Sequence, residues 1–222
     1  MSTATPDTPS REYHHAHHFP TATAEAEAGK LGMWIFLATE ILLFSGLFMA
    51  YAAYRSTHAE MFKAAHHMLD WKLGAVNTMV LIFSSLTMAL AVRSAQTNKR
   101  AQSAGLLVVT LLCACAFLVV KYFEYSHKIH VGTLPGEYYT YKGPELANVE
   151  SPHIFFGIYF LMTGLHGLHV LIGMAAISWV LVRTLRGEFY SKYFFPVELV
   201  GLYWHLVDLI WIYLFPLLYL VG

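Results

Sequence analysis

Leu31-Gly-Met-Trp-Ile-Phe-Leu-Ala-Thr-Glu40-Ile-Leu-Leu-Phe-Ser-Gly-Leu-Phe-Met-Ala50 is a nearly continuous apolar run that holds one glutamate. As a helix rising about 1.5 Å per residue, it predicts a membrane span with Glu40 near the middle of a hydrocarbon core roughly 30 Å thick. An ionisable group at that depth costs roughly 2.5–3.5 kcal/mol on insertion scales, so it is seldom kept without a partner or a task. The function should therefore be sought among the buried polar groups.

The composition of the whole chain is that of a membrane protein. Apolar residues make up 57% of the 222 residues and charged residues only 13%. The net charge of zero leaves no global field to attract nucleic acid, which is not an expected partner. We expect an all-α, polytopic bundle of five transmembrane helices in a single membrane domain, residues 31–222, with spans at about 31–54, 73–92, 105–125, 153–182 and 198–220.

Residues 1–30 differ in kind from the rest of the chain. They are rich in Thr, Ala, Pro, Ser and Glu and contain no apolar core of a secretory signal, so they predict a polar, loosely ordered tail. A solvated tail is the preferred interpretation of its histidine cluster, and binding of a soft divalent metal is the alternative; the cluster comprises His14, His15, His17 and His18.

The basic residues predict the orientation of the spans, because Lys and Arg near span ends stay cytoplasmic. The loops after the second and fourth spans are basic, with Arg93, Lys99 and Arg100 in one and Arg183, Arg186 and Lys192 in the other. This pattern predicts a cytoplasmic N-terminus and places Gly222 outside. The loop after the first span fits less well, since it also carries Arg55, Lys63 and Lys72.

The fourth span carries two histidines, His166 and His169, on one face of the helix. We expect both to be neutral and hydrogen-bonded across helices; ligation of a metal or haem is the alternative. Haem is disfavoured, because two histidines ligating haem in a bundle come from opposite sides. The same helix should be slim enough for close approach by a neighbour, because it carries Gly157, Gly164, Gly167 and Gly173.

The fifth span places Glu198, His205 and Asp208 near one stripe. Asp208 and His205 lie one turn apart, where a shared or exchanged proton would lower the cost of burial. The partner of Glu40 must come from another span, and His205, His166 or Asp208 are the predicted candidates. Polar residues of the second span are expected to form hydrogen bonds between helices; these are Asn77, Thr78, Ser84 and Ser85.

Glu124-Tyr-Ser-His127 has the spacing found in di-iron helical bundles, which need two copies and two further glutamates. Only one copy is present, and it falls at the end of the third span, where we expect it near water, so a chance match is the better explanation. There is also no phosphate loop, haem-attachment motif or histidine-box array. The residues alone indicate a five-helix bundle with an internal acid–histidine network and no visible redox centre.

Three segments together resemble subunit III of the haem–copper respiratory oxidases, in its short five-helix bacterial form. They are the Glu40 run from Gly32 to Phe44, the stretch Thr163-Gly-Leu-His166-Gly-Leu-His169-Val-Leu-Ile-Gly173, and Tyr203-Trp-His205-Leu-Val-Asp208-Leu-Ile-Trp211. Lys121-Tyr-Phe-Glu124-Tyr is similar to the acidic, aromatic end of another helix of the family. The resemblance covers roughly residues 30–222.

The resemblance implies a non-catalytic subunit of a proton-pumping terminal oxidase that reduces oxygen to water in the bacterial cytoplasmic membrane. Such a subunit carries no haem or copper itself; it packs against subunit I, which holds these cofactors, and has subunit II as a further partner. It supports the stability of subunit I and proton uptake. It contacts membrane lipids and in long family members holds phospholipid, a property left open here because the short form lacks two helices. The resemblance implies an intramembrane proton or structural network of Glu40, Glu124, His166, His169, His205 and Asp208.

Several alternatives remain open from the sequence. The long acidic loop at about 125–152, with the Lys121–Glu124 segment, favours cytochrome c as the electron donor over quinol. Subunit III of a quinol oxidase and an accessory subunit of nitric oxide reductase are the related alternatives. A proton-coupled transporter and a metal-dependent membrane enzyme are alternatives of other classes. The network of buried carboxylates is interpreted as structural in the first place, with direct proton handling as the second hypothesis.

Overall fold

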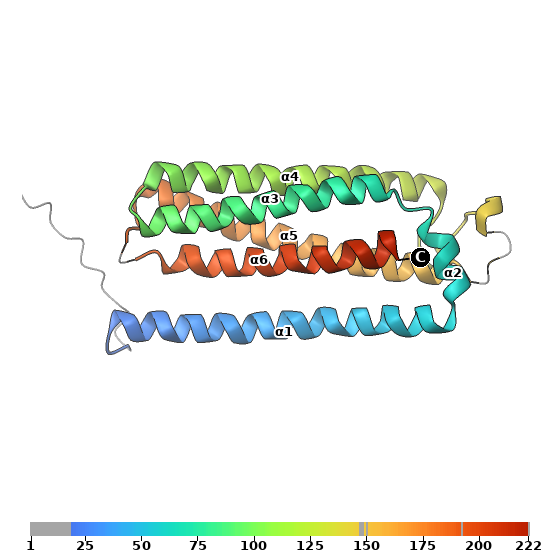
Figure 1. The fold of residues 1–222 in the computed structure, drawn as a ribbon, viewed down its shortest axis with the longest axis horizontal. Helices are drawn as coiled ribbons and strands as arrows, with labels where there is room; N and C mark the ends of the chain where they lie inside the picture. Colours follow the sequence, from blue (N-terminus) through green and yellow to red (C-terminus); the bar gives the residue numbers. More distant parts are fainter. Residues whose placement is uncertain (1–18, 147–148, 150, 192, 222) are drawn as a thin grey trace, which may run out of the picture.

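The computed structural model describes residues 19–146, 149, 151–191 and 193–221. Five long helices run side by side along the molecule (Figure 1) and are named α1 (Ala22–Thr57), α3 (Trp71–Gln96), α4 (Arg100–Val131), α5 (His153–Arg186) and α6 (Phe195–Phe215). Each is long and apolar enough to cross a membrane. The prediction of an all-α bundle of five spans is confirmed.

The helices are longer than the predicted apolar spans. α1 begins inside the predicted polar tail, because the Thr21 side chain accepts a hydrogen bond from the Ala24 amide at 3.1 Å and so caps the helix. α4 and α5 both end at a glycine in the left-handed conformation, Gly132 and Gly187, with φ of +84° and +76°. The clustered histidines of the tail lie outside the described residues.

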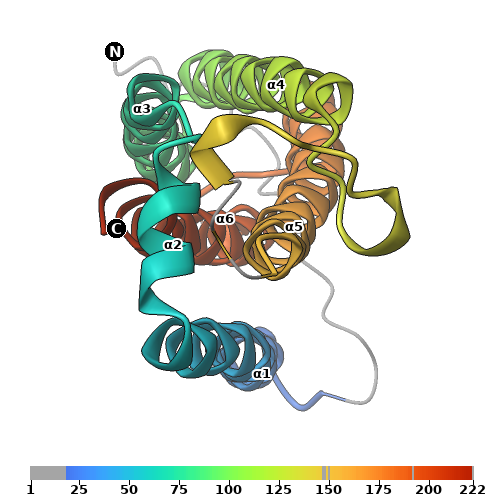
Figure 2. The same ribbon diagram turned by 90° about the vertical axis from the view of Figure 1, so that its right-hand side faces the viewer.

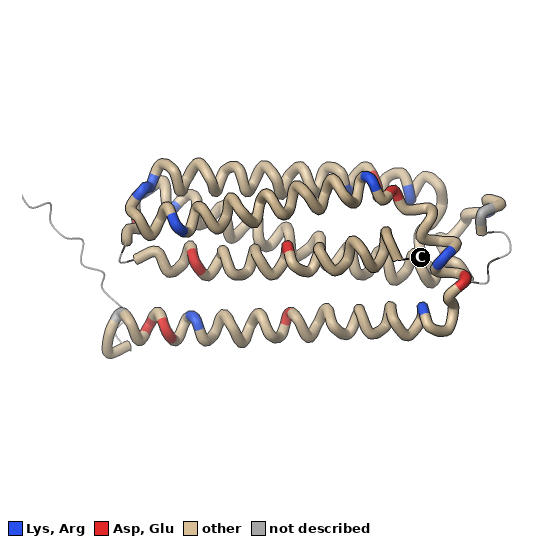
Figure 3. Tube along the Cα trace, in the orientation of Figure 1, with Lys and Arg blue, Asp and Glu red and all other residues tan. Residues whose placement is uncertain are grey.

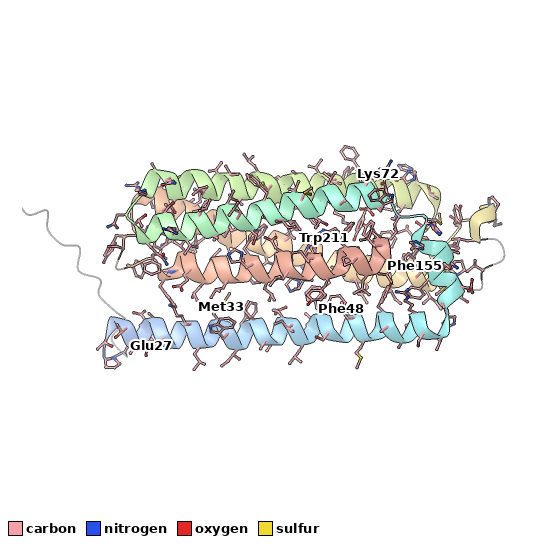
Figure 4. All side chains as sticks on the ribbon, viewed as in Figure 1. Glu27, Met33, Phe48, Lys72, Phe155 and Trp211 are labelled. Carbon is pink, nitrogen blue, oxygen red and sulfur yellow. The ribbon has the colours of Figure 1, made fainter. Side chains whose placement is uncertain are left out.

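α1 stands apart from the other four helices (Figure 2). Its buried apolar side chains form one narrow seam at every seventh residue, Leu37, Phe44 and Tyr51, while most of the opposite surface is exposed and apolar. Met33 and Phe48 point from α1 toward the bundle, and Trp211 lies within it (Figure 4). α1 is therefore attached along a single line and presents most of its surface to lipid.

A short helix that the sequence did not predict, α2 (Ala59–His66), crosses one end of the bundle between α1 and α3 (Figure 2). It buries Phe62, whose ring packs edge-on against Tyr51 at 5.1 Å and Phe155 at 5.3 Å between centroids. These contacts join the ends of α1 and α5. From the sequence this segment is expected to be a loop, because two turns are too short to show a clear helical period.

The loop between α4 and α5 lies at the same end and is shorter than predicted, because α4 continues to Val131. It contains two 3₁₀ turns, η1 (Gly136–Tyr138) and η2 (Pro144–Leu146). Its start is fixed by the Gly132 carbonyl, which accepts hydrogen bonds from the amides of Thr140 and Tyr141 at 2.9 and 3.1 Å.

A single turn of π-helix, η3 (Pro216–Leu220), continues α6. Proline has no amide hydrogen to donate, so Pro216 interrupts the regular hydrogen-bond pattern of α6. The wider turn carries Leu218 and Tyr219 into the interior, where both are buried.

Charged residues lie mostly toward the ends of the bundle, but acidic residues also occur near the middle of α1 and α6 (Figure 3). In the sequence these are Glu40, at the middle of α1, and Asp208, close to the middle of α6. Each of these acidic side chains must therefore be covered by a neighbouring helix or paired with another polar side chain.

Candidate functional site: polar groups at mid-membrane depth

Glu40 of α1 forms a hydrogen bond with His169 of α5, with Nε2 and Oε2 2.8 Å apart. The other ring nitrogen, Nδ1, lies 2.8 Å from the Leu165 carbonyl oxygen and must donate to it, since a carbonyl only accepts. Nε2 therefore accepts a proton from a neutral Glu40 or donates one to its carboxylate. In either arrangement one proton is shared between the two side chains.

The predicted partners of Glu40 were wrong, because His169 takes that place. Three residues on an α-helix turn through about 300°, so His166 and His169 point in directions about 60° apart. His169 reaches α1, whereas His166 enters the core of the other four helices. The sequence cannot show this difference, because it does not reveal how α5 is rotated against its neighbours.

His166 is fully buried, and neither ring nitrogen has a hydrogen-bond partner among the described residues. Its ring lies between Phe117, edge-on at 5.5 Å, and Trp211 at 5.2 Å between centroids. The predicted cross-helix hydrogen bond therefore exists for His169 and is absent, within the described residues, for His166.

Asp208 and His205 of α6 each contact a different serine of α3. The Ser84 hydroxyl lies 3.4 Å from Oδ2 of Asp208, and Ser85 Oγ lies 2.7 Å from Nδ1 of His205. No hydrogen bond joins Asp208 to His205 in the described part of the chain, so the prediction of a proton shared within that pair was wrong. The two side chains do not meet because residues three apart on a helix point in directions about 60° apart.

The serines confirm a second prediction, that polar residues of this span bond between helices. Ser84 also accepts from the Trp204 indole at 3.1 Å, and Thr78 accepts from the Trp211 indole at 3.1 Å. Asn77 is the exception, since neither atom of its buried amide has a partner among the described residues.

Glu124 lies in a buried cluster with Lys121, Tyr159 and Tyr219. Lys121 Nζ is 2.9 Å from Oε2, while the two tyrosine hydroxyls donate to Oε1 at 2.7 and 2.5 Å. Lys121 also donates to the Tyr219 hydroxyl at 2.6 Å and lies over the Trp211 ring at 4.6 Å. Every charge in this cluster is thus hydrogen-bonded, which is the condition for a buried ion pair to be tolerated.

The expected position of Glu124 near water was wrong, since the residue is only 6% exposed. The cause is twofold: α4 continues beyond it to Val131, and Tyr219 of the π-helical turn covers it. Sequence reasoning also missed the role of Tyr219, for which no sequence signal exists, because its contact depends on the turn after Pro216.

The candidate residues therefore fall into separate sets and do not form one continuous hydrogen-bonded network within the described residues. One set joins α1 to α5, one joins α3 to α6, and the third joins α4, α5 and the C-terminal turn; His166 stands alone. Among the described residues, no group of three or more His, Cys, Asp or Glu side chains is placed to hold a metal ion. The arrangement can tie helices together and, at Glu40 and His169, hold one movable proton.

A family model for cytochrome c oxidase subunit III matches residues 10–222. The chain belongs to the cytochrome c oxidase subunit III family. It is therefore a subunit III of the haem–copper respiratory oxidases, a multi-pass membrane protein that works in a complex with other oxidase subunits.

Two relatives in the subunit III family illustrate its range. A "Cytochrome c oxidase subunit 3" from Synechocystis sp. is 31% identical over 208 residues, covering 93% of this chain and 79% of the relative. A "Probable quinol oxidase subunit 3" from Staphylococcus aureus (strain USA300) is 27% identical over 212 residues, covering 94% of this chain and 96% of the relative. The two names differ in the electron donor, so membership of the family does not decide it.

Proposed function

We propose that this subunit III belongs to a proton-pumping oxidase of a bacterial cytoplasmic membrane that takes electrons from cytochrome c and reduces oxygen to water. In this role the chain is non-catalytic: it packs directly against subunit I, whose haem and copper carry out the chemistry, with subunit II in the same complex. The proposal is supported by the family match over nearly the whole chain and by the 31% identity with the Synechocystis relative.

The observation that carries a proton-related role is the contact of 2.8 Å between Glu40 and His169. A carboxyl and an imidazole that share a proton can release or accept one without leaving an isolated charge in the hydrocarbon. We assign to this pair the support of proton uptake by subunit I. The sets around Asp208 and Glu124 serve as structural ties, because each joins two or three helices.

The choice of cytochrome c rests on the acidic loop between α4 and α5, where Glu137 is exposed. The Lys121–Glu124 segment no longer contributes to that argument, since both side chains are buried and out of reach of a soluble donor. Quinol is the second candidate donor, favoured by the close agreement in length with the Staphylococcus aureus relative.

The test is purification of the tagged chain from its native membrane in mild detergent, followed by subunit masses, a reduced-minus-oxidised spectrum and oxygen consumption with each donor. We expect haem bands, two larger subunits and oxidation of reduced cytochrome c. Oxidation of quinol but not of cytochrome c would make quinol the donor. Phospholipid retained in the complex would appear in the same mass spectrum. A colourless chain that purifies alone and moves protons in liposomes would replace the oxidase by a transporter.

A further inference from the structure

We propose that the groove between α3 and α6 beside His205 is the surface on which a transmembrane helix of another oxidase subunit docks. The proposal rests on the assembly of the chain into an oxidase. It adds which face of the bundle meets the partner and what the partner must offer there.

The first reason is an incomplete hydrogen-bonding group at mid-membrane depth. Nδ1 of His205 is bound to Ser85, whereas Nε2 forms no hydrogen bond within the described residues, and the side chain is only partly buried. His205 lies within about 5 Å of the middle of the span Phe195–Leu220, at 1.5 Å per residue. Lipid tails offer no hydrogen bond there, and leaving a polar group unpaired in them costs several kcal/mol per group.

Three hydroxyl side chains on the outer surface do not raise this demand. The exposed hydroxyls of Thr39, Ser45 and Ser178 each donate to a carbonyl of their own helix, at 2.6, 2.7 and 2.7 Å. They can face lipid as they stand. His205 differs, because its Nε2 forms no hydrogen bond to its own helix within the described residues.

The second reason is the shape of the surface. A groove of about 380 Å³ runs from His205 toward one end of the bundle, between α3 and α6. Ala89 lines it with a small, exposed side chain, which allows a neighbouring helix to approach closely, whereas Gly201 is buried against Val92 of α3. The small side chain of Ala89 in the same groove as the unpaired nitrogen of His205 favours a helix over a mobile acyl chain as the occupant.

The third reason is the charge at the end of the groove. Glu198 is paired with Lys30 of α1 at 3.1 Å, but Arg93 is exposed and forms no ion pair among the described residues. The partner should therefore carry a hydrogen-bonding side chain at the depth of His205 and a carboxylate or carbonyl oxygen near Arg93. On the outer surface of α4, by comparison, Leu112 and Val119 are exposed apolar side chains.

Photo-cross-linking in intact native membranes tests the surface directly. Benzoylphenylalanine would replace Ala89 in the groove or, as the matched control, Leu112 on the outer face of α4; both positions are exposed, so the bundle should tolerate both. We expect position 89 to form a covalent adduct with a larger oxidase subunit and position 112 to form adducts with lipid alone. Lipid adducts alone at position 89, in membranes where the wild-type complex purifies intact, would overturn the proposal.

Co-purification provides a second measurement. Ala89→Trp should lower the recovery of the larger subunits at least about tenfold, a change that corresponds to roughly 1.4 kcal/mol of binding. Leu112→Trp should recover them as the wild type does. Equal recovery by the two variants would overturn the surface while leaving the proposed function intact. A wild-type chain without larger subunits would overturn the proposed function and the surface with it.

Discussion

The carboxyl of Glu40 and the imidazole of His169 meet 2.8 Å apart at the middle of α1 and α5. This contact spans a narrow interface, in which Leu37, Phe44 and Tyr51 are the buried apolar side chains of α1. The hydrogen bond has two separable properties: it ties α1 to the bundle, and it holds a proton at mid-membrane depth. A substitution that keeps the first and removes the second can tell which one the oxidase uses.

Glu40→Gln is that substitution, because the glutamine amide can still donate to Nε2 of His169 but cannot release a proton. We expect the complex to assemble normally, with slower proton uptake or faster inactivation during turnover in the reconstituted oxidase. Thr39→Val is the matched control, since Thr39 lies next to Glu40 and bonds only its own helix. Turnover, pumping and lifetime equal to those of the wild type would leave Glu40 a structural role alone.

Lys121→Met should destabilise the subunit strongly. It leaves the Glu124 carboxylate buried without its cation, and breaking a buried ion pair from one side costs about 3–5 kcal/mol. Removal of both charges in Lys121→Met/Glu124→Gln should restore much of the loss. Thermal unfolding of the detergent-solubilised subunit measures both. Lys72→Met on the exposed surface is the control; a loss of the same size in that variant would argue against the ion pair.

The five spans could be predicted because each requires only a long apolar stretch, which is a property of one segment at a time. The polar contacts could not be predicted, since each depends on the rotation of two helices about their axes. His166 and His169 differ by three residues, yet one lies unpaired in the core and the other binds Glu40. The sequence marked both as buried and polar, but only the packed structure distinguishes their partners.

Segments shorter than a span were missed for a different reason. α2 and the π-helical turn at Pro216–Leu220 have no periodic pattern of their own, and their conformation is set by the aromatic contacts they make. Phe62 and Tyr219 acquire their roles only when the long helices bring Phe155 and Glu124 within reach. Tertiary contacts, and not local propensity, decide such elements.

Tyr219→Phe tests the C-terminal turn. The substitution keeps the ring but removes the hydroxyl that donates to Glu124 and accepts from Lys121. Hydrogen bonds to charged groups contribute about 1.5–3 kcal/mol each, so we expect a clear drop in the thermal stability of the subunit. Tyr213→Phe is the matched control, because Tyr213 is 64% exposed. Equal melting temperatures for the two variants would show that the turn is held by packing alone.

Gly173→Ala tests the close contact between α5 and α6. A Cβ at this position would lie 2.7 Å from Cε3 of the buried Trp204 ring, which cannot move aside, so overpacking of about 1–3 kcal/mol is expected. Gly167→Ala on the same helix should be neutral or slightly stabilising, because no atom lies within 4 Å of its Cβ position. The yield and melting temperature of the two variants give the comparison; similar losses would mean that the effect lies in α5 itself.

The orientation of the chain is a further prediction, made from the basic residues beside the second and fourth spans. An odd number of spans, the five found among the described residues, places the start of α1 and the end of α6 on opposite sides of the membrane. We expect a C-terminal alkaline phosphatase fusion to be active outside and a C-terminal green fluorescent protein fusion to be dark when exported through the Sec pathway. The same reporters placed after Asn98, between α3 and α4, should give the opposite pair of results. Reversed results at both positions would place the basic loops outside. The acidic loop would then face the other side of the membrane, and the argument for cytochrome c would change with it.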